Sequence, residues 1–184
     1  GSLSKLWRLA KRTKKLPLPA ELTAAKNACG FSNLKINYKS AHITKINPHT
    51  RLDFGGIAKG YTADKMSKML KNKGLPSSSI AAGGDIVTGE APPGKDSWEV
   101  QIIPYHDKPV KPMTIRIANA AVSTSGNTEQ SIKIKNQSYS HILDPTSGIG
   151  LTHNNAATVI APSGTQSDPL ATALCIGGKD ALKI

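Results

Sequence analysis

The feature that most constrains this chain is a glycine-rich turn that runs directly into a helical pattern, over residues 53–64 (DFGGIAKGYTAD). After Gly60, apolar residues recur at helical spacing, and Gly74 is suited to end the helix. We therefore predict a helix that begins near Ile57. The first turn of a helix has unpaired N–H groups and a partial positive charge, so this turn is a candidate phosphate site. Lys59 adds a positive charge, although an ordinary strand-to-helix turn would carry the same glycines.

Length and composition favour one domain of mixed secondary structure. A chain of 184 residues is long enough to bury one core of its own. Aromatic residues make up only 4%, while 16 glycines and 12 prolines interrupt short apolar runs, which is typical of many short strands. We predict a single α+β domain over residues 1–184, with mixed, mostly antiparallel sheets flanked by helices.

The net charge narrows the classes of partner. A formal charge of +12 indicates anionic partners such as nucleotides, nucleic acid or a lipid surface, without choosing among them. Cys29 and Cys175 lie far apart without a Cys-x-x-Cys pattern, so we expect no zinc knuckle or disulfide scaffold. No apolar run approaches the roughly 18 residues of a membrane span, and no signal-peptide pattern is present. Gly1-Ser2 resembles a remnant of tag cleavage, so we expect the natural protein to begin further upstream.

Periodicity predicts the remaining elements. We expect a basic amphipathic helix over 3–15, a helix over 19–27, a hairpin within 34–46, a strand over 79–82, and antiparallel strands near 98–102 and 113–117. Tyr139, His141 and Leu143 alternate, so we place His141 on one face of a strand. Ser167 is suited to cap a last helix that holds Pro169 in its first turn.

Two further polar turns are candidate ligand sites. Gly83, Gly84 and Asp85 follow a strand, where free N–H groups suit an anion and the carboxylate suits a sugar hydroxyl or a metal ion; a β-bulge with a surface aspartate is the alternative. The hydroxyl-rich residues 122–127 at a strand end include Thr124, Ser125 and Gly126, which suit hydrogen bonds to phosphate or ribose.

Three other polar residues carry competing interpretations. Asp168 and Thr172 are four residues apart, so on a helix both face the same side and offer two oxygen ligands to Mg²⁺; a capping aspartate with a back-bonded threonine is the alternative. A histidine such as His141 on an apolar face is often a satisfied core residue. We interpret His106 as a solvated loop residue.

In combination these segments resemble the ApbE family of flavin transferases (FAD:protein FMN transferases), which implies a T-fold-like α+β architecture. The resemblance rests on five short motifs in a fixed order: residues 53–64 (DFGGIAKGYTAD), 82–85 (AGGD), 123–126 (STSG), 141–148 (HILDPTSG) and 168–174 (DPLATAL). It implies an enzyme that splits FAD at its pyrophosphate and passes FMN to a threonine or serine hydroxyl of an acceptor protein, releasing AMP.

The resemblance also implies roles for individual residues. Asp53, Lys59 and Ile142 would contact FAD, together with the two polar turns described above. Asp168, Thr172 and the carbonyl of Gly56 would bind Mg²⁺, and His141 would be the general base. Such a division of labour suits phosphoryl transfer, which depends mainly on positioning and charge neutralisation.

The chain departs from the family pattern in three places. The family's N-terminal part is absent, Pro169 stands where alanine is usual, and residues 146–148 lack a usual basic residue. An FAD pyrophosphatase that uses water, or a flavin-binding or nucleic-acid-binding module without catalysis, are the alternative functions. We expect no nucleic acid partner, because no aromatic stacking cluster or nucleic-acid motif is present. For the full-length bacterial protein the resemblance implies a periplasmic or cell-envelope location, with membrane anchoring.

Overall fold

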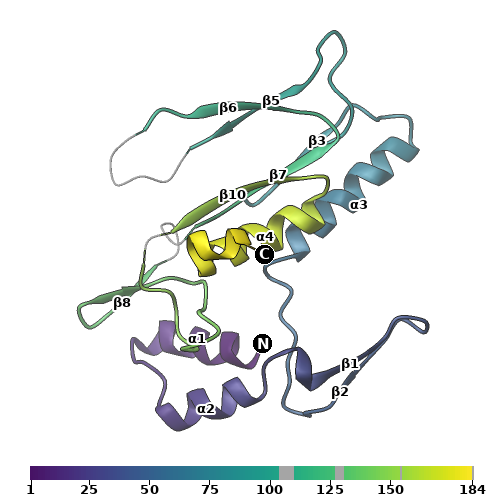
Figure 1. Ribbon diagram of the computed structural model, residues 1–184. Coiled ribbons are helices and arrows are strands. Elements are labelled where there is room, and N and C mark those ends of the chain that lie inside the picture. Colours follow the sequence, from purple (N-terminus) through teal and green to yellow (C-terminus); the bar gives the residue numbers. More distant parts are fainter. Residues whose placement is uncertain (104–109, 127–130, 154, 184) are drawn as a thin grey trace. The chain divides into compact units, whose positions relative to one another are not determined.

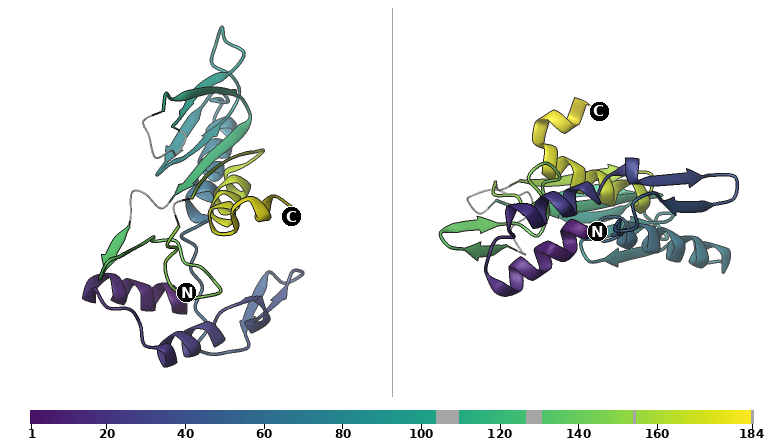
Figure 2. Two further views of the ribbon diagram at one scale, coloured as in Figure 1. Left: turned by 60° about the vertical axis from the view of Figure 1, so that its left-hand side comes forward. Right: turned by 90° about the horizontal axis from the view of Figure 1, so that it is seen from below.

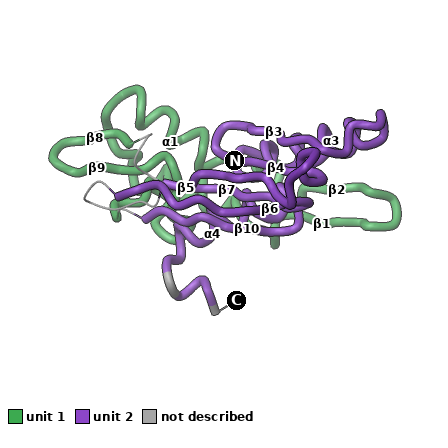
Figure 3. The backbone as a smooth tube through the Cα atoms, turned by 90° about the horizontal axis from the view of Figure 1, so that it is seen from above, with its two compact units in different colours: residues 1–53, 127–153 green, residues 54–126, 154–184 purple. Residues whose placement is uncertain are grey.

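In a computed structural model of the protein, the structure describes residues 1–184 except 104–109, 127–130, 154 and 184. Residue contacts group the chain into two compact units, which Figure 3 shows in separate colours. The first unit comprises residues 1–53 and 127–153, and the second comprises residues 54–126 and 154–184. Each unit therefore joins segments that are far apart in the sequence. No helix among the described residues has both the length and the apolar character needed to cross a lipid bilayer.

The first unit combines helices with short antiparallel hairpins (Figure 1). Its elements are α1 (Ser2–Thr13), α2 (Pro19–Asn27), the 3₁₀ helix η1 (Phe31–Asn33), β1 (Leu34–Asn37), β2 (His42–Lys45), β8 (Ile132–Ile134) and β9 (Gln137–Tyr139). Helices α1 and α2 pack side by side, as the views of Figures 1 and 2 agree. The predicted basic helix, the helix over 19–27 and the hairpin within 34–46 are confirmed.

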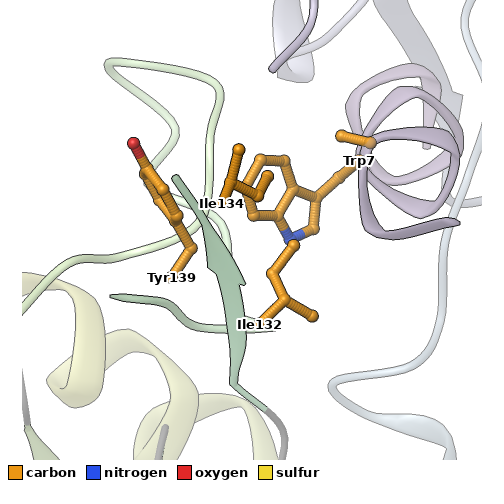
Figure 4. Packing of buried hydrophobic residues seen from close by; sticks show 5 residues of the cluster. Trp7, Ile132, Ile134 and Tyr139 are labelled. Carbon is orange, nitrogen blue, oxygen red and sulfur yellow. The ribbon is translucent and has the colours of Figure 1, made fainter. Parts of the chain in front are cut away.

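Trp7 on α1 is the centre of the first unit's core. The core side chains come from α1, β8 and β9: Trp7, Ala10, Ile132, Ile134 and Tyr139 (Figure 4). The rings of Trp7 and Tyr139 meet edge to face with their centroids 5.7 Å apart. Trp7 Nε1 donates a hydrogen bond to the Ser140 carbonyl at 3.1 Å, so the buried indole leaves no polar atom unpaired. This contact joins residues 133 positions apart in the chain.

The second unit is built on a four-stranded antiparallel sheet in the order β10-β7-β4-β3. Its elements are α3 (Ala58–Asn72), β3 (Ser79–Ala82), β4 (Asp85–Thr88), β5 (Trp98–Ile102), β6 (Met113–Ile117), β7 (Ala120–Gly126), β10 (Ala156–Ala161), α4 (Gly164–Gly177) and the 3₁₀ helix η2 (Gly178–Lys183). The predicted helix after Ile57 and the predicted antiparallel pair, β5 with β6, are confirmed.

Successive side chains of β7 lie on opposite faces of the sheet and pack into different parts of the core. Ala121 packs against Ala63 of α3, whereas the next residue, Val122, packs against Val100 of β5. Since neighbouring residues of a strand point to opposite faces, the helices and the β5–β6 hairpin cover opposite faces of the sheet, as Figure 1 shows. Ser123 and Asp85, which are paired in register, therefore belong to the face that the helices cover.

The two polar turns lie at strand ends, as predicted. Residues 83–84 directly follow β3, whose predicted range 79–82 is confirmed, and they turn the chain into β4, which begins at Asp85 and was not predicted. The hydroxyl-rich residues 123–126 form the end of β7 and pair with β10. Small hydroxyl residues suit a strand here because α4 covers the face on which Ser123 lies. The strand β10 was also missed, since its alanine-rich sequence has a weak strand pattern.

The predicted start of the last helix is wrong. Helix α4 begins at Gly164 with Ser163 as N-cap, so Ser167 lies inside the helix and is fully buried. Pro169 is consequently an interior proline rather than a first-turn one. The carbonyl of Thr165 loses its usual helical N–H partner for this reason. The helix starts early because Gly164 and Thr165 find an acceptor on α3, which no local pattern could indicate.

Candidate active site

The glycine-rich turn at the start of α3 is the position at which we predicted a bound anion. In the structure the carboxylate of Asp168 lies there. Asp168 lies on α4 and is 1% exposed. Its Oδ2 accepts a hydrogen bond of 3.2 Å from the Gly60 N–H in the first turn of α3, and its Oδ1 accepts one of 3.1 Å from Lys59 Nζ. A helix N-terminus stabilises negative charge. The protein therefore supplies an anion of its own at this turn.

Lys59 links Asp168 to a second buried carboxylate, Asp85 at the start of β4. Lys59 Nζ lies 3.0 Å from Asp85 Oδ2. This is the distance of an ion pair, so the ammonium group of Lys59 is the positive charge that this buried oxygen faces. The earlier alternative of a surface aspartate at this position is thus excluded, because Asp85 is only 2% exposed.

Opposing effects act on the charges of this cluster. Burial raises the pKa of Asp85 above its usual value, by more than the hydrogen bond from Ser123 and the contacts with Lys59 lower it. Burial also acts to lower the pKa of Lys59, but the two aspartates outweigh it, and the pKa of Lys59 is raised. Lys59 therefore stays an ammonium ion that neutralises one of the two carboxylates.

The glycine pair Gly83 and Gly84 forms the two-residue turn of the β3–β4 hairpin. Their φ angles are 56° and 96°, which glycine adopts without strain and a type I′ turn requires. A Cβ at Gly83 would lie 3.2 Å from Lys59 Cδ. Gly83 thus leaves room for the side chain of Lys59 across the turn.

Hydroxyl groups connect β7 to α4 beside this cluster. Ser123 Oγ and Ser167 Oγ are 2.7 Å apart, and Ser125 Oγ and Thr172 Oγ1 are 3.1 Å apart. Thr124 lies between them on the opposite face, where its hydroxyl pairs with Thr158 of β10. Of the predicted cofactor residues on β7, Ser125 is therefore on the helix side with Asp168, and Thr124 is not.

The three predicted metal ligands lie together in the second unit. Asp168 and Thr172 are one helical turn apart on α4, and a Cβ at Gly56 would lie 3.7 Å from Thr172 Oγ1. Carboxylate, hydroxyl and carbonyl oxygens form the kind of donor set that Mg²⁺ takes. Within the described ranges no three His, Cys, Asp or Glu side chains cluster as metal ligands, so such a site would depend on hydroxyl and main-chain oxygens as well.

Helices α3 and α4 hold each other in place at this site. Asp64 on α3 accepts hydrogen bonds of 2.8 Å from both Gly164 N–H and Thr165 N–H, at the start of α4. Asp168 on α4 caps α3 in return, through Gly60 N–H. The helix backbones touch between the caps, since a Cβ at Gly60 would lie 2.0 Å from the Gly164 carbonyl oxygen.

Asp53, His141 and Ile142 belong to the first unit, whereas the other predicted site residues belong to the second. Asp53 forms an ion pair with Arg8 at 3.0 Å. The placement of His141 on a strand face is wrong: β9 ends at Tyr139, and His141 is exposed in the bend that follows. The bend forms because Ser140 Oγ accepts a hydrogen bond of 3.0 Å from Ile142 N–H. His106 lies outside the described residues.

Residues 1–184 match the sequence model of the ApbE family. This chain belongs to the ApbE family. An FAD:protein FMN transferase of Treponema pallidum is 30% identical over 196 residues, which cover 97% of this chain and 53% of that protein. An FAD:protein FMN transferase of Salmonella typhimurium is 27% identical over 184 residues, with 97% and 53% covered. The ApbE-family chain thus spans about half the length of the curated relatives it matches.

Solved ApbE structures share the fold. Flavin transferase ApbE from Vibrio cholerae superposes with a TM-score of 0.82 at 27% identity, covering 98% of this chain and 58% of that one. The ApbE protein of Thermotoga maritima gives 0.81 at 28% identity, covering 99% and 60%. The predicted α+β class is confirmed, and every described strand pair of the ApbE-family chain is antiparallel.

Sequence reasoning about this ApbE-family chain missed the residues that support the site. Asp64 stands at the end of the first motif, but its spacing gave no reason to expect a cap on a helix 100 residues away. Ser167 has the hydroxyl of a typical N-cap, and that local pattern concealed its buried bond to Ser123. The roles of Asp64 and Ser167 can be recognised only from contacts between segments that are distant in the sequence.

Proposed function

We propose that this chain is part of a flavin transferase that cleaves FAD at its pyrophosphate and transfers FMN to a threonine or serine hydroxyl of an acceptor protein, releasing AMP. The proposal is supported by membership of the ApbE family and by relatives named FAD:protein FMN transferase that match 97% of the chain. In this proposal both compact units belong to one transferase domain over residues 1–184.

The observation that carries the proposal is the buried cluster of Lys59, Asp85 and Asp168 next to Gly56 and Thr172. The ammonium group of Lys59 suits the charge of a pyrophosphate. Asp168, Thr172 and the Gly56 carbonyl would hold Mg²⁺, which would neutralise charge on the pyrophosphate oxygens. Asp85 orients Lys59 toward this site.

We assign the acid–base step to His141. The hydroxyl oxygen of the acceptor would bond to the phosphorus of the FMN half, the bond between that phosphorus and the AMP oxygen would break, and the hydroxyl proton would pass to the imidazole. An imidazole changes charge near neutral pH, which suits it to this step. By the family resemblance, the proposal also gives contacts with FAD to Asp53, Ile142, residues 83–85, Ser125 and Gly126.

The test is incubation of the protein with FAD, Mg²⁺ and an acceptor protein that carries the target threonine or serine. We expect the acceptor to gain the mass of FMN less one water, AMP to be released in equal amount, and both to be abolished by EDTA. FMN and AMP without a modified acceptor would instead identify an FAD pyrophosphatase. Bound flavin without any turnover would identify a flavin-binding module.

For the full-length protein the proposal includes a periplasmic or cell-envelope location with membrane anchoring, and no nucleic acid partner. Fractionation of cells that express the full-length protein, with detection in the membrane, periplasmic and cytosolic fractions, tests the location. Recovery from the cytosol alone would contradict it.

A further inference from the structure

Lys59 occupies an oxygen of Asp168 that the proposed Mg²⁺ ion would use, and it also pairs with the neighbouring carboxylate of Asp85. Its Nζ lies 3.0 Å from Asp85 Oδ2 and 3.1 Å from Asp168 Oδ1. A Mg²⁺ ion bound to a carboxylate oxygen lies only about 2.1 Å from it. An ammonium group between both carboxylates therefore takes up the place and the negative charge that such an ion needs.

Lys59 is also the member of the cluster that is free to move. The side chains of Asp85 and Asp168 are 3% and 2% exposed, whereas that of Lys59 is 41% exposed. Asp168 is further held by Gly60 N–H through its other oxygen. The lysine side chain has four flexible carbons and lies against Gly83, where an added Cβ would be 3.2 Å from Lys59 Cδ.

We propose that Lys59 keeps the cation position closed until a pyrophosphate-containing ligand attracts its ammonium group, so that divalent cation and FAD bind cooperatively. This inference rests on the proposed function. A pyrophosphate offers Lys59 a new anionic partner, and its departure exposes the oxygens of Asp85 and Asp168. By linkage, FAD then tightens cation binding by the same factor as the cation tightens FAD binding.

The first test measures Mn²⁺ binding without nucleotide, by the loss of the free-ion EPR signal. Lys59→Met should bind Mn²⁺ at least about tenfold more tightly than the parent protein, a typical size for such coupling. Lys68→Met is the matched control, because it removes the same charge from an exposed position on α3. Lys68 is nine residues from Lys59, or about 13 Å along the helix, which exceeds the screening length of about 10 Å at 0.1 M salt. The Lys68→Met variant should therefore bind Mn²⁺ as tightly as the parent protein does.

The second test measures FAD binding by flavin fluorescence, in EDTA and in Mg²⁺. In the parent protein Mg²⁺ should tighten FAD binding about tenfold, and in Lys59→Met the gain should shrink to less than about threefold. Lys59→Arg keeps the charge and guards against failure of Lys59→Met to fold; it should bind Mn²⁺ no more tightly than the parent.

The outcomes separate the two proposals. Equal Mn²⁺ affinity of the parent and Lys59→Met, or an equal effect of Mg²⁺ on FAD binding in both, would overturn the role of Lys59 and leave the transferase proposal standing. Tighter Mn²⁺ binding by Lys59→Arg than by the parent would also overturn it. Absence of both Mn²⁺ and FAD binding in the parent protein would overturn the two together.

Discussion

Asp64 and Asp168 each cap the helix that carries the other. Asp64 on α3 accepts hydrogen bonds from Gly164 and Thr165 N–H, and Asp168 on α4 accepts one from Gly60 N–H. Because one carboxylate is the proposed metal ligand and the other fixes the helix that bears it, the geometry of the site depends on both.

Replacement of Asp64 should therefore weaken the fold. Asp64→Ala leaves the first N–H groups of α4 without an acceptor and also removes a bond from the Thr165 hydroxyl. We expect a loss of about 2 to 3 kcal/mol in the free energy of unfolding, measured in urea. The exposed Asp96→Ala is the control and should stay within about 0.5 kcal/mol of the parent. A similar small change for Asp64→Ala would show that water replaces the cap.

The contact between Gly60 and Gly164 should not tolerate a side chain. A Cβ at Gly164 would lie 2.6 Å from the Gly60 carbonyl oxygen and 2.9 Å from its Cα, so Gly164→Ala must push the helices apart. We expect a loss of more than about 2 kcal/mol in thermal or urea unfolding. A Cβ at Gly94 would meet no atom within 4 Å, so Gly94→Ala is unfavourable only because φ is 74° there. It should lower the free energy of unfolding by about 1 to 2 kcal/mol. An equal loss in both variants would contradict the steric argument.

Asp168→Asn tests the metal role without removing the cap. The amide oxygen can still accept the Gly60 N–H bond, but the charge that faces Lys59 is gone. We expect Mg²⁺-dependent transfer to fall by more than about a hundredfold, since even residues behind a metal ligand cost about ten- to a hundredfold. Thermal unfolding should show a folded protein. Turnover equal to that of the parent would refute the assignment of Asp168 as a ligand.

His141→Ala separates chemistry from binding. His141 is exposed in the bend after β9, so its removal leaves the core around Trp7 intact. A lost general base should lower the rate of transfer by about a hundredfold or more, while FAD affinity stays within about threefold. Single-turnover rates and fluorescence titration measure the two quantities. Equal losses in both would point to a binding role for His141.

Asp144 should make the first unit sensitive to acid. Burial acts to raise the pKa of Asp144, but hydrogen bonds from Thr146 and Ser147 outweigh it and lower the pKa below the usual 3.8. A carboxyl group with a lowered pKa in the folded state stabilises the fold above about pH 4, and this contribution is lost as the pH falls through the folded value.

Asp144→Asn should therefore unfold more easily than the parent near pH 7, because the amide offers its neighbours one neutral acceptor in place of two charged ones. The difference should shrink as the pH falls below about 3.8, where the parent also becomes protonated. Urea unfolding of both proteins across this pH range measures it. A difference that does not vary with pH would assign the effect to the turn geometry instead of the charge.

Local patterns in the sequence predicted the elements whose stability is local. Helices α1, α2 and α3 and the β1–β2 hairpin follow from periodicity, proline and glycine positions, and these were predicted to within a few residues. The shared face of Asp168 and Thr172 follows from the helical repeat alone. The order of the five motifs was sufficient to indicate the family.

Tertiary contacts alone decided how the polar groups pair. Lys59 and Asp168 meet across 109 residues, and Gly60 and Asp168 across 108, so no window of sequence could show that a carboxylate occupies the predicted anion position. Burial of Asp85 depends on β4 lying within the sheet and under the helices. Helix α4 begins earlier than predicted because Asp64 accepts hydrogen bonds from N–H groups in its first turn, which have no partner within the helix. A buried polar group must find a partner, and the fold determines which one is within reach.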